Sequence, residues 1–311
     1  WINTINWKIT NEMSNDLKNK CIVCDCSSSH IIQTKIREKS HNVLMCDSCN
    51  FIFLQDYSGI DYSRNYGGLT LSTKWNKEES MIKRSKSLEK FNEVVIDIIK
   101  KSNYKNILEI GAGNGASVYS LKNSIDKLSI DCIEINDEDR RFIQEILASS
   151  VYSKILDTET IYDVIYGHHV FEHFIDPIQV LNEIYQVSTP DCKLYFSLPN
   201  FDDFYSSTLN KEQKEKYLTF NFHLAHPYYY TIETFSKLIG KTSWKINKIS
   251  TVQDYSVLNY FNWYINGIRS KDIESGTKVN KDIDWINENF VNSIERMQKG
   301  NNISVILEKN E

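Results

Sequence analysis

Short apolar runs and amphipathic segments alternate along the middle of the chain. The apolar runs predict strands at 106–110, 128–135, 151–156, 162–166 and 193–198, and two later runs at 244–252 and 303–308 bring the number of strands to seven. Helical spacing of apolar residues is found at 85–101, after residue 115, at 137–148 and at 178–187. This alternation predicts an α/β fold, a doubly wound and mostly parallel sheet with helices on both faces.

The same pattern divides the chain into segments of different character. Residues 1–20 are polar and predict a flexible lead, 21–54 contain a cysteine cluster, and 55–84 have the weak periodicity of a linker. The alternating domain covers 85–311, with a helical, aromatic-rich insertion at about 255–300. A long insertion between core strands either covers the core or contacts a substrate.

Composition narrows the class of protein. The balance of 36 Lys+Arg against 41 Asp+Glu gives a net charge of -5, which argues against nucleic acid as the main partner. The 41% hydrophobic content excludes disorder, and no run approaches the ~20 apolar residues of a membrane span. Trp1 opens the sequence, so the chain can be part of a longer protein, with Met13 as an alternative start. Without a secretory signal, seven cysteines indicate a reducing, cytoplasmic compartment.

Five of these cysteines fall within residues 21–49. They include two C-x-x-C pairs, which predict two knuckles that share one zinc ion through Cys21, Cys24, Cys46 and Cys49. A closed site of four thiolates has no open coordination position, so its expected role is structural. The open alternatives are reduced thiols without metal, or a ligand set that includes Cys26, His30 or His41.

Three of the eleven glycines, Gly111, Gly113 and Gly115, follow a predicted strand and open a helix. Glycines there permit a tight turn and the close approach of a ligand to the backbone. Their spacing also fits a dinucleotide site, so an NAD(P) oxidoreductase is one hypothesis. Glu109 argues against it, because a carboxylate in a buried strand needs a partner and a cationic ligand group would supply one.

A second carboxylate, Glu134, ends the next predicted strand. An acid at this place in an α/β fold can hold two ribose hydroxyls. The alternative is a carboxylate at a helix start or on the surface.

These segments together resemble the class I S-adenosylmethionine-dependent methyltransferases, which have a Rossmann-like fold. The matching residues are 109–115, Glu134, the segment 162–177 and the closing run 302–309, which is similar to the family's antiparallel last strand. The resemblance covers about 85–311. It implies that the Gly111–Gly115 backbone faces the methionine part of the cofactor and Glu134 the ribose. By position, it implies that Asp157 meets the adenine amino group and His168 the methionine end.

A narrower likeness is to the sugar C-methyltransferases of deoxysugar pathways. It rests on the four-cysteine module, a linker with Tyr62 and Tyr66, and the late run His223-x-x-His226-Pro-Tyr-Tyr-Tyr-Thr. The two tyrosines either close over the cofactor or pack. That group uses a Glu-His pair for deprotonation, whereas Ala225 precedes His226 here, and its long C-terminal domain is absent. These departures argue against C-methylation of a ketosugar, but they do not argue against methyl transfer itself.

Methyl transfer from a sulfonium is an in-line displacement, which a general base assists when the nucleophile starts protonated. Histidine suits this role, and the catalytic candidates are His226, His223 and His169. His226 ranks first because its loop follows the fifth strand, where ligand sites of parallel sheets open. His173 is a further candidate, or it braces the turn that ends at Pro177.

The predicted function is methyl transfer from S-adenosylmethionine to a small molecule: a sugar, a nucleotide-sugar or a surface glycan. One alternative is a protein or nucleic-acid methyltransferase that docks its polymer on the zinc module. Another is a non-catalytic domain that binds cofactor poorly. The expected cofactors are S-adenosylmethionine and a structural zinc ion. The sequence does not determine the oligomeric state.

Overall fold

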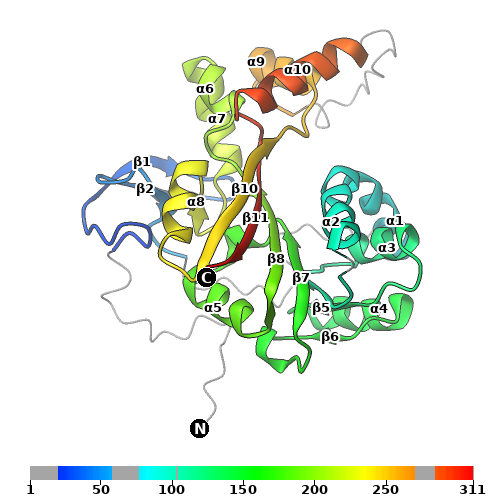
Figure 1. Cartoon of the computed structure of the whole chain (residues 1–311). Coiled ribbons are helices and arrows are strands. Elements are labelled where there is room, and N and C mark those ends of the chain that lie inside the picture. Colours follow the sequence, from blue (N-terminus) through cyan, green and yellow to red (C-terminus); the bar gives the residue numbers. More distant parts are fainter. Residues whose placement is uncertain (1–19, 58–76, 103, 270–283, 311) are drawn as a thin grey trace.

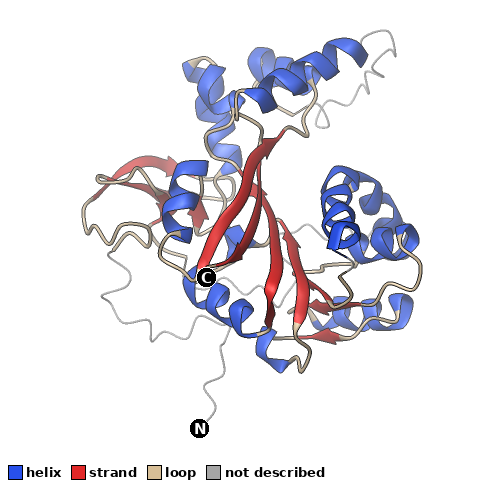
Figure 2. Ribbon diagram, viewed as in Figure 1, coloured by secondary structure: helices blue, strands red, loops and turns tan. Residues whose placement is uncertain are grey.

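A seven-stranded sheet forms the centre of the molecule (Figures 1 and 2). The computed structural model describes residues 20–57, 77–102, 104–269 and 284–310. Along the sheet the strands lie in the order β10 (Trp244–Val252), β11 (Asn302–Lys309), β8 (Ser188–Pro199), β7 (Tyr162–His168), β4 (Ile107–Ile110), β5 (Ile130–Ile133) and β6 (Val151–Tyr152). Strands β8 to β6 pair in parallel, and β11 is antiparallel to both of its neighbours. The predicted fold class is confirmed.

Both faces of this sheet are covered by helices, because alternate strand residues point to opposite sides. Leu108 and Ile165 belong to the hydrophobic cluster that includes α5 (Pro177–Gln186) and α8 (Ile232–Ile239). Ile107 and Val164 belong to a second cluster, with α2 (Glu89–Ser102), α3 (Ala116–Ser124) and α4 (Asp137–Leu147). Of the described helices, none is both long and apolar enough to cross a membrane.

Two elements differ from the prediction. The helix expected over 85–101 begins at Lys77 and is divided at Leu88 into α1 (Lys77–Ser87) and α2. The hydroxyls of Ser85 and Ser87 donate to backbone carbonyls three residues earlier, which competes with the regular helical pattern at this point. The strand expected over 151–156 is only β6, followed by a 3-10 turn, η4 (Ile155–Asp157).

A second, smaller sheet joins the cysteine-containing segment to the main domain. It contains β1 (Ser29–Lys35), β2 (Ser40–Cys46), β3 (Ile52–Leu54) and β9 (Tyr228–Tyr229), paired in that order and all antiparallel. Strand β9 belongs to the late histidine and tyrosine run, so Ile52 and Phe53 pair with residues about 175 positions away. This pairing was not predicted from the sequence.

Four helices form a layer beyond the end of the main sheet, at the top of Figure 1. They are α6 (Phe204–Thr208), α7 (Lys211–Asn221), α9 (Val257–Asn266) and α10 (Asp284–Arg296). Their aromatic side chains pack together, with Tyr205, Tyr217 and Trp263 buried at the centre. Of the aromatic residues of the insertion, Tyr260, Trp263 and Phe290 belong to this cluster, whereas Phe261, Tyr264 and Trp285 are exposed.

Candidate functional site

The glycine loop between β4 and α3 adopts left-handed backbone conformations at Gly111, Gly113 and Gly115, with φ of 72°, 55° and 74°. A Cβ atom on Gly111 would lie 2.6 Å from Cγ2 of Val170, so a larger residue does not fit there. A Cβ on Gly113 would meet nothing within 4 Å. The backbone at Gly113 is therefore open to a ligand, as expected of a loop that contacts a cofactor.

Glu134 lies at the end of β5 and supports this loop. Its Oε2 accepts a hydrogen bond from the amide of Gly113 at 2.7 Å, and its Oε1 accepts one from the amide of Asn136 at 2.8 Å. The side chain is buried, and burial raises its pKa. Asn136 caps α4, so Glu134 is neither a surface carboxylate nor the helix cap. Each carboxylate oxygen keeps a further lone pair that can accept a hydrogen bond.

Glu109 is buried in β4, and the hydroxyl of Tyr166 donates to its Oε2 at 3.2 Å. No Lys, Arg or His in the described part of the chain lies within ion-pair distance of this carboxylate. Burial raises the pKa of Glu109 to about 8. A cationic ligand group nearby would favour its ionised form.

The other two predicted cofactor residues follow β7 and β6, which β4 and β5 separate in the sheet. His168 ends β7, with its ring 4.7 Å from that of Phe91 and 4.2 Å from that of His169. Burial holds its pKa well below the usual range, and its Nδ1 has no hydrogen-bond partner in the described chain. Asp157 is exposed in η4 after β6, and it accepts a hydrogen bond from Ser153. Tyr62 and Tyr66 lie outside the described residues.

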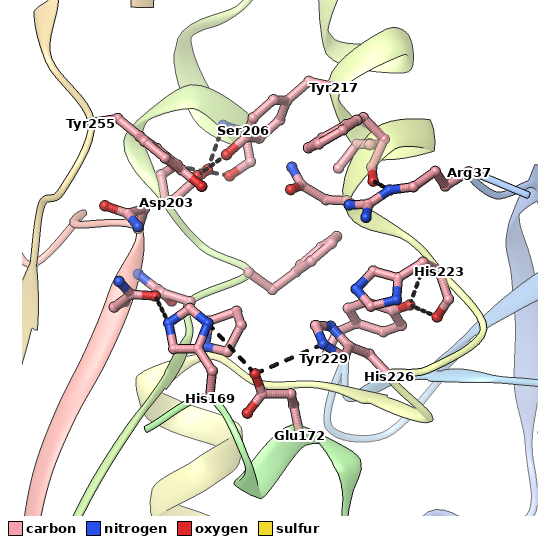
Figure 3. Close-up of a pocket in the computed structure, with 18 of the residues that line it drawn as sticks. Arg37, His169, Glu172, Asp203, Ser206, Tyr217, His223, His226, Tyr229 and Tyr255 are labelled. Carbon is pink, nitrogen blue, oxygen red and sulfur yellow. Dashed lines mark hydrogen bonds and ion pairs between the residues drawn. The ribbon is translucent and has the colours of Figure 1, made fainter. Parts of the chain in front are cut away.

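A cavity of about 230 Å³ opens beside the ends of β8 and β11 (Figure 3). We call it the histidine pocket, because His169, Glu172, His223 and His226 line one side of it. The opposite side comes from α6, α7 and the segments around Tyr255 and Arg269. The three predicted catalytic histidines are thus brought together from two separate segments.

The imidazoles of the pocket are held in a defined arrangement. His169 adopts a left-handed conformation with φ of 51°, and its Nε2 lies 3.0 Å from Oδ1 of Asn302. The rings of His223 and His226 have centroids 3.7 Å apart. Burial lowers the pKa of His169 to about 4 and that of His223 to about 3, and places that of His226 well below the usual range. All three rings are therefore neutral at pH 7.

Glu172 is the main residue of the pocket that sequence reasoning missed. It belongs to the 3-10 turn η5 (Phe171–His173), is 1% exposed, and has no hydrogen-bond partner on either oxygen in the described chain. Its Oε1 lies 3.9 Å from Nδ1 of His169 and 3.8 Å from Nε2 of His226. Burial raises its pKa to about 8. The segment 162–177 was considered for its family resemblance and for its histidines, and Glu172 had no predicted chemical role.

His173 lies beside this group and does not line the pocket. Its Nδ1 is 2.9 Å from the carbonyl oxygen of Ala225, so it braces the late histidine run. The turn that ends at Pro177 is held instead by Asp176, whose carboxylate accepts from the amide of Gln179 as the N-cap of α5.

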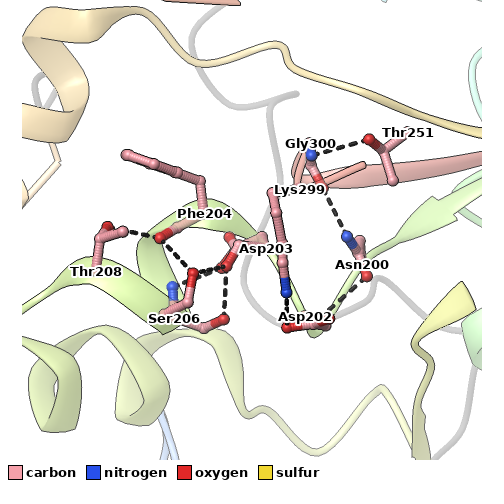
Figure 4. A network of polar contacts seen from close by, with 10 residues as sticks. Asn200, Asp202, Asp203, Phe204, Ser206, Thr208, Thr251, Lys299 and Gly300 are labelled. Atoms are coloured by element: carbon pink, nitrogen blue, oxygen red, sulfur yellow. Dashed lines mark hydrogen bonds and ion pairs between the residues drawn. The ribbon is translucent and has the colours of Figure 1, made fainter. Parts of the chain in front are cut away.

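The polar wall of the pocket is held by a hydrogen-bond network (Figure 4). The side chain of Asn200 donates to the carbonyl of Gly300 at 2.8 Å, and Lys299 pairs with Asp202 at 2.5 Å. Asp203 accepts from the amide of Ser206 at 2.7 Å and from the hydroxyl of Tyr217. These contacts hold the loop after β8 against the loop before β11.

The cysteine-containing segment contributes one side chain to the pocket. Arg37, in the turn between β1 and β2, donates from Nε to the carbonyl of Phe220 at 2.7 Å. Its guanidinium lies 4.1 Å from the centre of the Phe220 ring, and that of Arg269 lies 4.3 Å from the same ring. This end of the pocket is therefore cationic, which sequence reasoning did not predict.

The four cysteines of the two C-x-x-C pairs converge. Their sulfur atoms lie within 4.8 Å of one another, and the Cys21–Cys49 and Cys24–Cys46 sulfurs are each 3.5 Å apart. The Cys26 sulfur is not part of this group and accepts instead from the amide of Ser28. Four convergent thiols fit a tetrahedral metal ion.

Comparison with known proteins gives the family to which the chain belongs. A family model described as "Methyltransferase domain" matches residues 74–247. No curated protein matches the chain. The plantazolicin methyltransferase BpumL in complex with SAH is 17% identical, with a TM-score of 0.46 over 76% of this chain and 89% of that chain. A SAM-dependent methyltransferase from Archaeoglobus fulgidus is 17% identical, with a TM-score of 0.47 over 78% and 97%.

Proposed function

The chain belongs to the S-adenosylmethionine-dependent methyltransferases, and from this premise we propose that it methylates a small polar molecule held in the histidine pocket. The methyl donor would lie along the glycine loop, with its ribose at Glu134, its adenine amino group at Asp157 and its methionine part near Gly111 to Gly115 and His168. The ammonium group of the donor is a suitable partner for the buried carboxylate of Glu109.

The observation that carries this proposal is that the segment at the end of β7 contacts both the glycine loop and the histidine pocket. Val170 packs where a Cβ on Gly111 or on Gly167 would lie, at 2.6 Å in each case, so it lies directly under the glycine loop. His169 and Glu172, on either side of Val170, line the pocket. The donor site on the loop and the acceptor site in the pocket therefore share this segment, and in-line transfer requires the reacting atoms to approach each other to about 3–3.5 Å beside it.

A neutral histidine of the pocket would accept the proton of the acceptor. His226 is the first candidate, because the carboxylate of Glu172 lies 3.8 Å from its Nε2 and would stabilise the imidazolium as it forms. His223 and His169 are the alternatives in the same pocket.

The character of the pocket supports a sugar, a nucleotide-sugar or a glycan as acceptor. Its wall combines amide and carboxylate groups with aromatic rings, including Asn200, Asp203 and Tyr229, which can bind hydroxyl groups and sugar faces. The guanidinium of Arg37 favours an acceptor that also carries a phosphate or carboxylate.

We also propose that Cys21, Cys24, Cys46 and Cys49 hold a structural zinc ion. A four-thiolate site leaves no position for substrate. Its effect on the pocket would be indirect, through the small sheet whose β1–β2 turn carries Arg37.

Two measurements test the function. Calorimetry with S-adenosylhomocysteine is expected to show binding that Glu134→Gln weakens by about tenfold, since one charged hydrogen-bond acceptor is lost. Glu138→Gln, on the exposed face of α4, is the matched control and should bind as the wild type does. Tight binding of NADH with no heat from S-adenosylhomocysteine would contradict the proposal.

The acceptor class is tested by transfer of a labelled methyl group from S-adenosylmethionine to a panel of free sugars, nucleotide-linked sugars and glycan fragments. One group of the panel is expected to be methylated, and His226→Gln should lower that rate by about a hundredfold. Transfer only to peptides or nucleic acids would overturn the assignment of the acceptor.

A further inference from the structure

One side of the histidine pocket contains a cluster of potential metal ligands that proton transfer alone does not require. Glu172, His173 and His226 each offer a ligand atom, and these atoms lie within 4.8 Å of one another. We propose that these three residues bind one divalent transition-metal ion, distinct from the ion of the cysteine cluster. The binding of this ion is inferred from the geometry, and its part in catalysis rests on the proposed function.

The carboxylate of Glu172 is the strongest indication. It is 1% exposed, and neither of its oxygens has a hydrogen-bond donor in the described chain. A buried carboxylate without a partner is strongly unfavourable, because it loses its hydrogen bonds to water and gains no hydrogen bond or ion pair in the protein. A cation bound at this place would supply the missing partner.

The distances around Glu172 suit a metal better than a direct hydrogen bond. Its Oε1 lies 3.8 Å from Nε2 of His226 and 3.9 Å from Nδ1 of His169, well beyond the ~2.7–3.2 Å of a hydrogen bond. Two ligands of one ion, each at about 2.0–2.2 Å from it, can have such a separation when the angle between them is wide.

The tautomers of the flanking histidines agree with this assignment. Nδ1 of His173 lies 2.9 Å from the carbonyl oxygen of Ala225, which can only accept, so Nδ1 of the neutral ring carries the proton. Asn302 donates its amide nitrogen to Asp254 and therefore presents its oxygen to Nε2 of His169, which leaves the lone pair of His169 on Nδ1, toward Glu172. A carbonyl or amide oxygen behind the second ring nitrogen is the usual support of a metal-bound imidazole.

The ligand set also indicates which ion binds and what it would do. Two imidazoles and one carboxylate suit manganese, iron(II), cobalt or zinc, and leave coordination positions open. Glu172 and His226 line the pocket, so the open positions would face the acceptor. An ion there would bind the acceptor hydroxyl and lower its pKa. With His226 bound to the ion, the base would be His223, the alternative named above, whose ring centre is 3.7 Å from that of His226.

The experiment uses the full chain with zinc in its cysteine cluster, titrated with Co²⁺ or Mn²⁺ in equilibrium dialysis followed by elemental analysis. About one further ion per chain is expected, and its cobalt spectrum should lack the intense thiolate bands of a cysteine site. Glu172→Gln and His226→Gln should each weaken this second site by at least about tenfold.

Glu183→Gln is the matched control, because Glu183 is a buried carboxylate on α5 that does not line the pocket. Calorimetry with S-adenosylhomocysteine on each variant reports whether the domain is folded, and it tests the methyltransferase assignment separately from the metal. Wild-type protein that binds S-adenosylhomocysteine but no further Co²⁺ or Mn²⁺ would overturn the proposal. Equal metal binding by a folded Glu172→Gln variant would overturn it as well.

Discussion

The glycine loop and the histidine pocket both depend on left-handed backbone, but they use different residues for it. The loop has glycines at Gly111, Gly113 and Gly115, whereas the pocket has His169 with φ of 51°. Left-handed backbone is nearly free for glycine and costs other residues about 1–2 kcal/mol. A loop that binds its ligand through backbone can use glycine, but a pocket that needs an imidazole must accept the strain.

The two sites also differ in how they are assembled. The loop and its supporting carboxylate come from residues 109–134, on adjacent parallel strands. The pocket draws on segments from Arg37 to Asn302, and the small sheet is attached through β9, next to the pocket. The cysteine cluster is therefore expected to support the pocket and to leave the glycine loop largely unaffected.

The largest expected effect comes from removing one zinc ligand. Cys46→Ser should abolish zinc retention and lower the free energy of unfolding of the small sheet by about 4 kcal/mol, because a metal-held segment loses its cross-link. The affinity for S-adenosylhomocysteine should change by less than about threefold, since the glycine loop is assembled separately. Elemental analysis, thermal unfolding and calorimetry measure these effects.

Cys26→Ser is the control for that change, because its sulfur lies outside the cluster. It should retain zinc and unfold as the wild type does. A loss of S-adenosylhomocysteine binding in Cys46→Ser would show that the two regions are not independent.

The second-largest effect is expected from a substitution in the glycine loop. Gly111→Ala places a Cβ 2.6 Å from Val170 in a left-handed conformation, so it should cost about 2–3 kcal/mol of stability. The displaced loop should bind S-adenosylhomocysteine more than about tenfold less tightly. Gly240→Ala is the control, since Gly240 has right-handed backbone and its added Cβ would come no closer than 3.4 Å to its neighbours. Unchanged affinity in Gly111→Ala would exclude a contact between this part of the loop and the cofactor.

A smaller effect concerns the pH dependence of stability. The pKa of Glu109 is about 8 in the folded chain and 4.5 ordinarily, so between these values the folded state keeps a proton that the unfolded state has lost. Stability without ligand therefore falls as pH rises through this window, by up to about 1.4 kcal/mol per unit. Glu109→Gln should remove this contribution, so between pH 5.5 and 7.5 its stability should rise by about 2.5 kcal/mol relative to that of the wild type.

Urea unfolding at pH 5.5 and 7.5 measures this difference. The contributions of the other buried acids to the pH dependence cancel, because both proteins contain them. Glu145→Gln, an exposed residue of α4, is the control and should follow the wild type. A Glu109→Gln variant with the wild-type pH dependence would contradict the assigned protonation of Glu109.

The smallest effect concerns the strain at His169. His169→Gly should be more stable than His169→Ala by about 1 kcal/mol, because only glycine adopts this conformation without strain. At Lys237, within α8, the alanine variant should instead be more stable than the glycine variant, by a similar amount. Equal stability of the two His169 variants would contradict the proposal that a non-glycine residue at this position strains the backbone.

Much of the fold could be predicted because its signals are local. Burial of alternate strand residues and the spacing of apolar residues in helices depend on near neighbours, so the seven strands were predicted correctly. The antiparallel orientation of the last strand was implied by the family resemblance. The division of α1 from α2 was missed, because serine hydroxyls that bond back to the helix do not change the hydrophobic pattern.

By itself, the sequence determined the class of fold, the methyltransferase family and the position of the glycine loop, since each is recorded in local patterns and short motifs along the chain. Only the tertiary structure decided that Glu172 lies between two histidines, that Asn302 orients His169 from 133 residues away, and that Arg37 reaches Phe220 across 183 residues. Such contacts depend on how distant segments pack, and no local periodicity records which polar side chains packing brings together.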